Sequence, residues 1–155
     1  MRQNKKASLI ILISILVVGL FIYLNQKRYF LDLPNNQSIT VWKKMGNECY
    51  ITSGKYYGIS EPDNFIKTSN VNDISLFFTD RLPKKILLDG ENCVIQNKSN
   101  EDVIFDNYVE NKNKYRGIIY KSDAKKNSDV NDDVTIVNIN IGGMNVTDKY
   151  GEKIE

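Results

Sequence analysis

The stretch DVTIVNINIGG, residues 133–143, gives the clearest structural signal in the chain. It is rich in Val, Ile and Thr, which fit a pleated and half-buried surface, and a pair of glycines ends it. Shorter β-branched and aromatic runs, separated by Gly, Asn, Asp and Pro, continue back to residue 38: SITVWK, ECYIT, KYYGI, NFIKT, ISLFFT, KKILL, NCVIQ, DVIF and RGIIYK. Closely spaced strands with turn signals between them predict a mainly β domain over 38–150, small, antiparallel and sandwich- or barrel-like. No convincing helical period follows residue 37.

Two hairpins can be predicted from turn residues. An Asp-Gly pair at 89–90 is typical of a type I′ turn, which would pair 85–88 with 91–96 and point Cys93 toward the core. A weaker Ser-Gly turn at 53–54 would pair 49–51 with 56–58 and place Cys49 on a core face. The polar stretch 121–133 predicts a long exposed loop.

Ala7 to Gln26 forms a run of twenty positions without a charged residue. As a helix it would extend for about 30 Å, the thickness of a bilayer's hydrocarbon core, with its backbone hydrogen bonds satisfied internally. A cleaved signal would be shorter and would end at small residues, which are absent here. A helix that is apolar on all sides is also a poor core element for a small domain. We therefore expect an uncleaved transmembrane signal-anchor at 7–26.

The flanking segments complete the expected organisation. Residues 1–6 would be a basic flank, 27–37 a juxtamembrane linker, and 151–155 a C-terminal tail. Three basic residues precede the apolar run and two follow it, and the α-amino group adds to the first side. This bias favours a cytoplasmic N-terminus and an extracytoplasmic C-terminal domain. The bilayer, contacted through Ala7 to Gln26, is thus the first expected partner.

Charge and composition exclude several functions. The basic excess flanks the apolar run, so the exported part is mildly acidic and gives no footprint for nucleic acid. The chain contains no histidine, which removes His-dependent nucleophiles and zinc sites of the HExxH type. We expect no catalytic residues, metal or cofactor. A carboxylate-based hydrolase using Asp80, Asp89 or Glu91 stays a less favoured alternative.

Cys49 and Cys93 would lie in an oxidising compartment if the domain is exported, where a disulfide can persist. Two buried free thiols fit the same pattern, because free cysteine behaves as a small apolar residue. The sequence leaves both states open.

Trp42, Tyr50 and Tyr57 form a possible ligand platform. Strand parity places Tyr50 and Tyr57 on the face opposite Cys49, and Trp42 extends that face. An exposed aromatic face would suit a glycan ring or a partner protein, whereas a face buried in a sandwich would make these core residues. The expected function is a non-enzymatic interaction or assembly module with a membrane or envelope protein as partner; a cell-wall or surface glycan-binding domain is the alternative.

Overall fold

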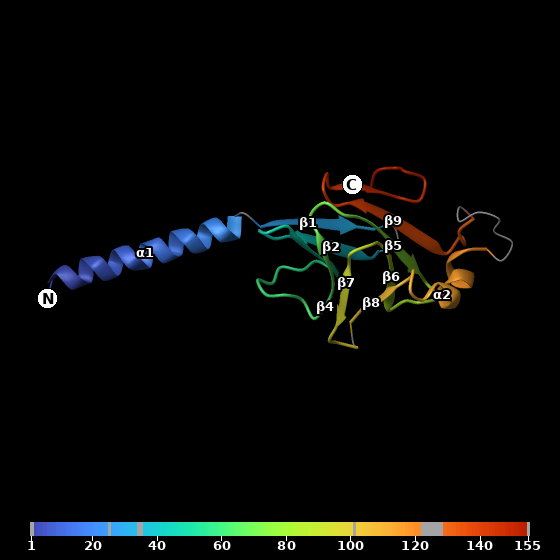
Figure 1. Ribbon diagram of the computed structural model, residues 1–155, viewed down its shortest axis with the longest axis horizontal. Coiled ribbons are helices and arrows are strands. Elements are labelled where there is room, and N and C mark those ends of the chain that lie inside the picture. Colours follow the sequence, from blue (N-terminus) through green and yellow to red (C-terminus); the bar gives the residue numbers. More distant parts are fainter. Residues whose placement is uncertain (1, 25, 34–35, 101, 122–128, 155) are drawn as a thin grey trace.

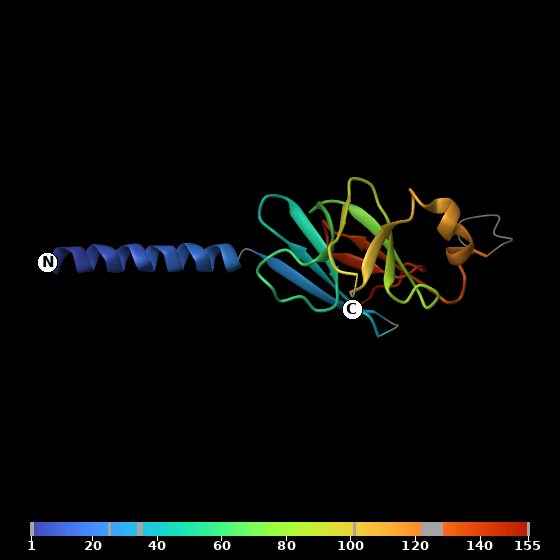
Figure 2. The same cartoon turned by 90° about the horizontal axis from the view of Figure 1, so that it is seen from below.

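Two five-stranded β-sheets pack face to face, and an N-terminal helix projects from one end of the pair (Figures 1 and 2). The computed structural model describes residues 2–24, 26–33, 36–100, 102–121 and 129–154, and the side chains of the N-terminal helix from 7 to 23. That helix is α1 (Arg2–Leu24). The predicted mainly β class is confirmed.

The first sheet, called sheet A, has the order β1-β2-β3-β4-β7, and the second, sheet B, has the order β10-β9-β5-β6-β8. Sheet A contains β1 (Lys27–Asp32), β2 (Ser38–Lys43), β3 (Glu48–Ser53), β4 (Asn64–Ser69) and β7 (Val94–Asn97). Sheet B contains β5 (Asp73–Thr79), β6 (Lys85–Asp89), β8 (Ile104–Asn107), β9 (Val134–Asn140) and β10 (Asn145–Thr147). Neighbouring strands are antiparallel except for the parallel pair β6 and β8.

The core lies between the sheets, because alternate side chains of each strand point to the same layer. Sheet A contributes apolar side chains that include Val41, Cys49 and Ile51, and sheet B contributes Leu76 and Val137 among others. All five are fully buried. The inward position predicted for Cys49 is confirmed.

The outer face of sheet B carries a second core under a short helix, α2 (Lys112–Ile119). Tyr115 and Ile119, four residues apart, pack from α2 onto Phe77 and Leu87. The reading of RGIIYK as a strand was wrong. Eight residues with only two buried positions give too short a pattern to reveal a helix at period 3.6.

Both predicted hairpins were wrong. β6 and β7 lie in different sheets, so the chain crosses between layers at Gly90 instead of turning back. A Cβ atom on Gly90 would lie 2.8 Å from Ile74 Cγ2, so this glycine permits close packing. β3 pairs with β2 through a turn in which Gly46 and Asn47 have positive φ, and residues 56–58 belong to a loop.

The expected linker 27–37 is replaced at its start by β1, whose register aligns Tyr29 with Val41 and Leu31 with Ile39. Residues 34–35 of that segment lie outside the described residues. The tail also pairs, since the Ile154 N–H donates to the Val146 carbonyl at 2.9 Å. Most of the predicted loop at 121–133 lies outside the described residues, while Val130 bridges to Tyr120.

Candidate binding surfaces

Trp42, Tyr50 and Phe65 form an aromatic cluster on the outer face of sheet A. Trp42 lies opposite Tyr50 across β2 and β3, with ring centroids 5.7 Å apart, and Phe65 meets Tyr50 edge-on at 5.2 Å. The shared face of Trp42 and Tyr50 therefore agrees with strand parity. Both rings are 1% exposed, so they do not form an open platform.

The segment that covers this cluster is the β3–β4 loop, residues 54–63. The Thr40 hydroxyl donates to the Gly54 carbonyl at 2.7 Å and accepts from the Tyr56 N–H at 2.9 Å. The Tyr56 ring then lies 5.9 Å from the Trp42 ring. A buried threonine thus fastens the loop and turns an outer sheet face into a small aromatic core.

Cations close the edge of the cluster. Arg28 and Lys44 lie over the Trp42 ring at 4.5 and 4.3 Å. The Tyr50 hydroxyl donates to Glu61 Oε1 at 2.7 Å, and burial followed by this hydrogen bond raises the pKa of Tyr50 to about 12. Tyr50 therefore remains a protonated donor over the physiological range, which suits packing and not proton transfer.

Tyr57 is separated from the other two predicted platform residues. Its ring packs against Phe30, with centroids 4.9 Å apart, and its side chain is 69% exposed. The structure therefore divides the expected set into a buried pair, Trp42 and Tyr50, and an exposed residue beside β1.

Cys49 and Cys93 are free thiols. Thr68 pairs with Cys49 on one side and, by continuation of the β4–β7 register, lies beside Cys93 on the other. Two strand spacings put the cysteine Cα atoms about 10 Å apart, beyond the roughly 7 Å that a disulfide spans. Burial raises the pKa of both thiols, that of Cys49 to about 12. The bridge considered from the sequence is not formed.

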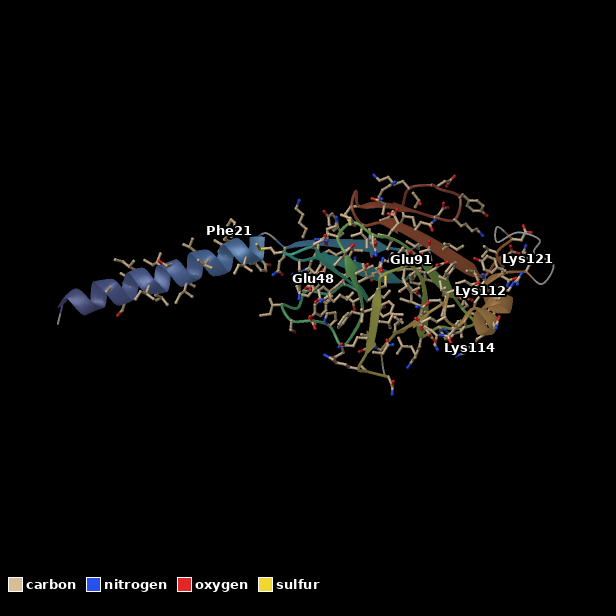
Figure 3. All side chains as sticks on the ribbon, viewed as in Figure 1. Phe21, Glu48, Glu91, Lys112, Lys114 and Lys121 are labelled. Atoms are coloured by element: carbon tan, nitrogen blue, oxygen red, sulfur yellow. The ribbon has the colours of Figure 1, made fainter. Side chains whose placement is uncertain are left out.

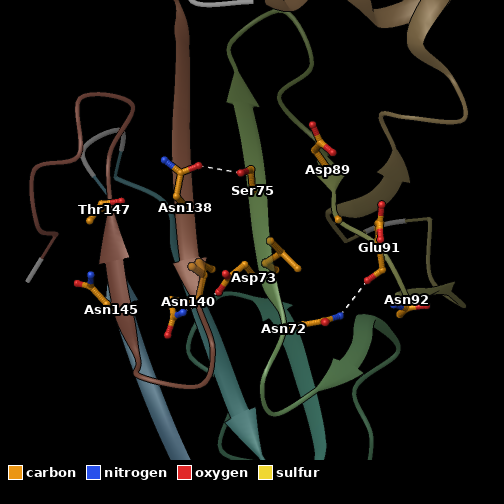
Figure 4. A pocket seen from close by; sticks show the side chains of 13 residues that line it. Asn72, Asp73, Ser75, Asp89, Glu91, Asn92, Asn138, Asn140, Asn145 and Thr147 are labelled. Carbon is orange, nitrogen blue, oxygen red and sulfur yellow. Dashed lines mark hydrogen bonds between the residues drawn. The ribbon is translucent and has the colours of Figure 1, made fainter.

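A polar groove crosses the part of the outer face of sheet B that α2 does not cover (Figure 4). Four strands align Thr147, Asn138, Ser75 and Asp89 in one row, since Asn138 pairs with both Thr147 and Ser75, and Ser75 pairs with Asp89. A second row, two residues along, consists of Asn145, Asn140 and Asp73. The groove encloses about 630 Å³.

Part of this groove is held in place by internal hydrogen bonds. The Ser75 hydroxyl donates to Asn138 Oδ1 at 2.7 Å, and Asn138 Nδ2 donates to the Asp148 carbonyl at 3.0 Å. Within the described part of the chain, the carboxylates of Asp89 and Glu91 have no hydrogen-bond or salt-bridge partner. Fixed amides beside free carboxylates are suited to a ligand rich in hydroxyl or N–H groups.

Sequence reasoning missed this groove, although a signal for it existed. In the sequence of residues 137–141, Asn138 and Asn140 alternate with Val137, Ile139 and Ile141. Such alternation indicates a strand with one polar face. The neighbouring segments that complete the groove are residues 73–75, 89–92 and 145–147, and only the sheet order brings them together.

A separate charged cluster joins α2 to sheet B. The Tyr115 hydroxyl donates to Asp106 Oδ2 at 2.5 Å, and Lys85 Nζ lies 3.3 Å from the same oxygen. Partial burial alone would raise the pKa of Asp106, but the hydrogen bonds from Tyr115 and Lys85 outweigh it and lower that pKa. In the described residues, no three Asp, Glu or Cys side chains gather as a metal site.

The apolar side chains of α1 project all around the helix, as Figure 3 shows with Phe21 labelled near its end. From Leu9 to Tyr23, the large apolar side chains are 45% to 64% exposed. Among the residues that the structure describes, no helix is both long and apolar enough to span a membrane.

Comparison of the chain with protein-family models, with curated proteins and with solved structures finds no match.

Proposed function

We propose that this chain is a membrane-attached, non-enzymatic interaction module, with the uncharged run 7–26, which extends beyond the described residues of α1, as a single-pass anchor and the β-sandwich as the binding domain. The observation that carries the proposal is the exposed apolar surface of α1, whose described side chains, 7–23, belong to neither of the two sandwich cores. Leaving such surface in water costs about 25 cal/mol per Å². Lipid removes that cost for a helix that is apolar on every side.

Extraction of the full-length chain from native membranes tests the anchor. We expect it to stay in the pellet after carbonate washing and ultracentrifugation. A double variant with Leu12→Lys and Leu16→Lys should move to the supernatant, because each cation at a helix centre costs about 2.5–3.5 kcal/mol on the insertion scale. The matched control, Leu12→Ile and Leu16→Ile, should remain in the pellet. Release of the unprocessed parent chain by carbonate would refute the anchor.

The proposed orientation places the N-terminus in the cytoplasm and the sandwich outside. In a Cys93→Ser background, Val109→Cys provides an exposed thiol far from α1, while the native Cys49 is buried. A membrane-impermeant maleimide should label this thiol in intact cells. Labelling only after lysis would reverse the orientation.

The groove on sheet B is the surface that we assign to ligand binding. Its fixed amides and free carboxylates favour a partner that donates several hydrogen bonds, such as a strand or loop of a membrane or envelope protein. Its acidic residues disfavour nucleic acid. We propose no role in catalysis; of the three carboxylates considered for a hydrolase, Asp89 and Glu91 border the groove and Asp80 does not line it.

A glycan is the second candidate ligand, and the two polar rows favour it. Sugar hydroxyls both donate and accept, which matches amides beside carboxylates, and the adjoining hollow contains Tyr150, a ring available for stacking. Tyr150 is also highly exposed.

One pair of variants distinguishes these outcomes. Glu91→Gln with Asn145→Ala alters groove side chains that are exposed, and Asn100→Ala with Glu110→Gln is the control elsewhere on the domain. Full-length protein in nanodiscs is tested for cosedimentation with cell-wall polysaccharide and for crosslinking from a photoreactive residue at position 145 in native membranes. Polysaccharide binding lost only in the groove variant supports a glycan, and a specific protein adduct supports a protein partner. If neither polysaccharide binding nor a specific protein adduct is observed, the groove is refuted as the ligand-binding surface.

A further inference from the structure

The tip of the β3–β4 loop lies at the end of the domain from which α1 projects, as both views show (Figures 1 and 2). Arg28, four residues after the end of α1, donates from Nη2 to the Gly58 carbonyl at 2.6 Å. This bond fixes Tyr57, Gly58 and Ile59 beside the helix exit.

The side chains at this tip are apolar and open. Ile59 is 83% exposed, and Tyr57 remains open although its ring packs on Phe30, itself 37% exposed. A hollow of about 280 Å³ separates the tip from the end of α1 and is lined by Tyr23, Gln26, Arg28, Phe30 and Tyr57. Ile59, two residues along the loop from Tyr57, adds an exposed aliphatic side chain to the packed pair of Tyr57 and Phe30 next to the anchor.

The short connection limits how far the tip can lie from a bilayer. Only residues 25 and 26 separate α1 from β1, and the three Cα–Cα steps from Leu24 to Lys27 span at most about 11 Å when extended. Tyrosine favours the membrane–water interface, where its ring is in apolar surroundings and its hydroxyl is hydrated. Lys27, exposed in the same place, suits lipid phosphate groups.

We propose that the tip Tyr57–Ile59, together with Phe30, is a second membrane contact that inserts into the headgroup region of the bilayer entered by α1. The contact rests on the proposed anchor. It would hold the sandwich in one orientation on the membrane, so that the loop binds lipid on its outer side and covers Trp42 on its inner side.

Tryptophan reporters in full-length protein, reconstituted in phosphatidylcholine vesicles with or without brominated acyl chains, test the contact. Leu12→Trp reports on α1, Ile59→Trp on the tip, and Val109→Trp on an exposed site three residues before α2, which lies at the other end of the domain from α1 in Figure 1. Emission is taken as the difference from the parent, which contains one tryptophan. We expect brominated lipid to remove about half of the added emission at position 59, as for a side chain roughly 5–10 Å below the interface. Position 12 should be quenched more strongly and position 109 not at all.

Each other outcome overturns part of the scheme. Quenching at position 12 without quenching at position 59 refutes the loop contact and leaves the anchor intact. Absence of quenching at position 12 refutes both. Equal quenching at positions 59 and 109 indicates general adsorption of the domain and also refutes the contact.

Discussion

Trp42→Ala should destabilise the sandwich strongly, because the indole is a core residue and not a ligand-binding ring. The side chain is 1% exposed between Tyr50, Tyr56 and two cations. A buried aromatic ring removes about 150–250 Å² from water, worth about 4–6 kcal/mol at 25 cal/mol per Å². Measured losses for such truncations are about 3–5 kcal/mol. We expect a loss of about 4 kcal/mol.

Urea unfolding of the full-length chain in detergent micelles, followed by circular dichroism, measures this loss. Tryptophan emission is unsuitable, since the substitution removes the chain's one tryptophan. With a slope of about 2 kcal/mol per M, the midpoint should fall by about 2 M. The control Tyr57→Ala, at an exposed ring, should change stability by less than about 0.5 kcal/mol. An unchanged midpoint for Trp42→Ala, with folding retained, would refute the core assignment.

Further predictions concern the Asp106 cluster, two glycines and the two cysteines. Tyr115→Phe should cost about 1–2 kcal/mol, because it removes the hydrogen bond to Asp106. Since the pKa of Asp106 is lowered in the folded state, its stabilisation is present above the ordinary carboxyl pKa of about 4 and lost as pH falls through the lowered folded value. Asp106→Asn should abolish this acid dependence in urea titrations. Gly90→Ala should destabilise by about 1–3 kcal/mol through its clash with Ile74, whereas Gly117→Ala, in α2 and with open space around it, should stabilise by about 0.5–1 kcal/mol. The denatured chain should contain two alkylatable thiols and show no gel shift on reduction, and a mobility change would contradict the free state of the cysteines.

Strand parity was predictable because it depends only on alternation within one strand. Cys49 points inward and Tyr50 outward even though the partner strand expected for them was wrong. Pairing is a property of two distant segments, and the turn signals did not determine it. At 89–90 the same Asp-Gly pair that suits a tight turn also suits a crossing, since Gly90 permits the close approach of Ile74.

The predicted start of the domain at residue 38 was wrong for a similar reason, because the pairing of residues 27–32 depends on a distant segment. Tyr29 and Phe30 after an apolar helix are typical of a membrane interface, and they also have high strand propensity. Only the β2 register shows that they belong to β1. The exposure of an aromatic side chain also depends on segments outside its own strand. The loop at 54–63 covers Trp42 and leaves Tyr57 exposed.

The positions of the two proposed surfaces are compatible with simultaneous use. The lipid contact lies on a loop of sheet A at the α1 end, whereas the groove lies on the outer face of sheet B, in the other layer. A domain that rested on the bilayer through sheet B would cover its own groove. Seating through Tyr57 and Ile59 instead leaves the rows of Asn138 and Asn140 facing water, where a partner attached to the same membrane or a surface polymer can reach them. The loop contact thus predicts that ligand binding at the groove is unaffected by the double variant Tyr57→Ser and Ile59→Ser in detergent. In membranes, where the variant loses its fixed orientation, binding to an immobile surface polymer should weaken.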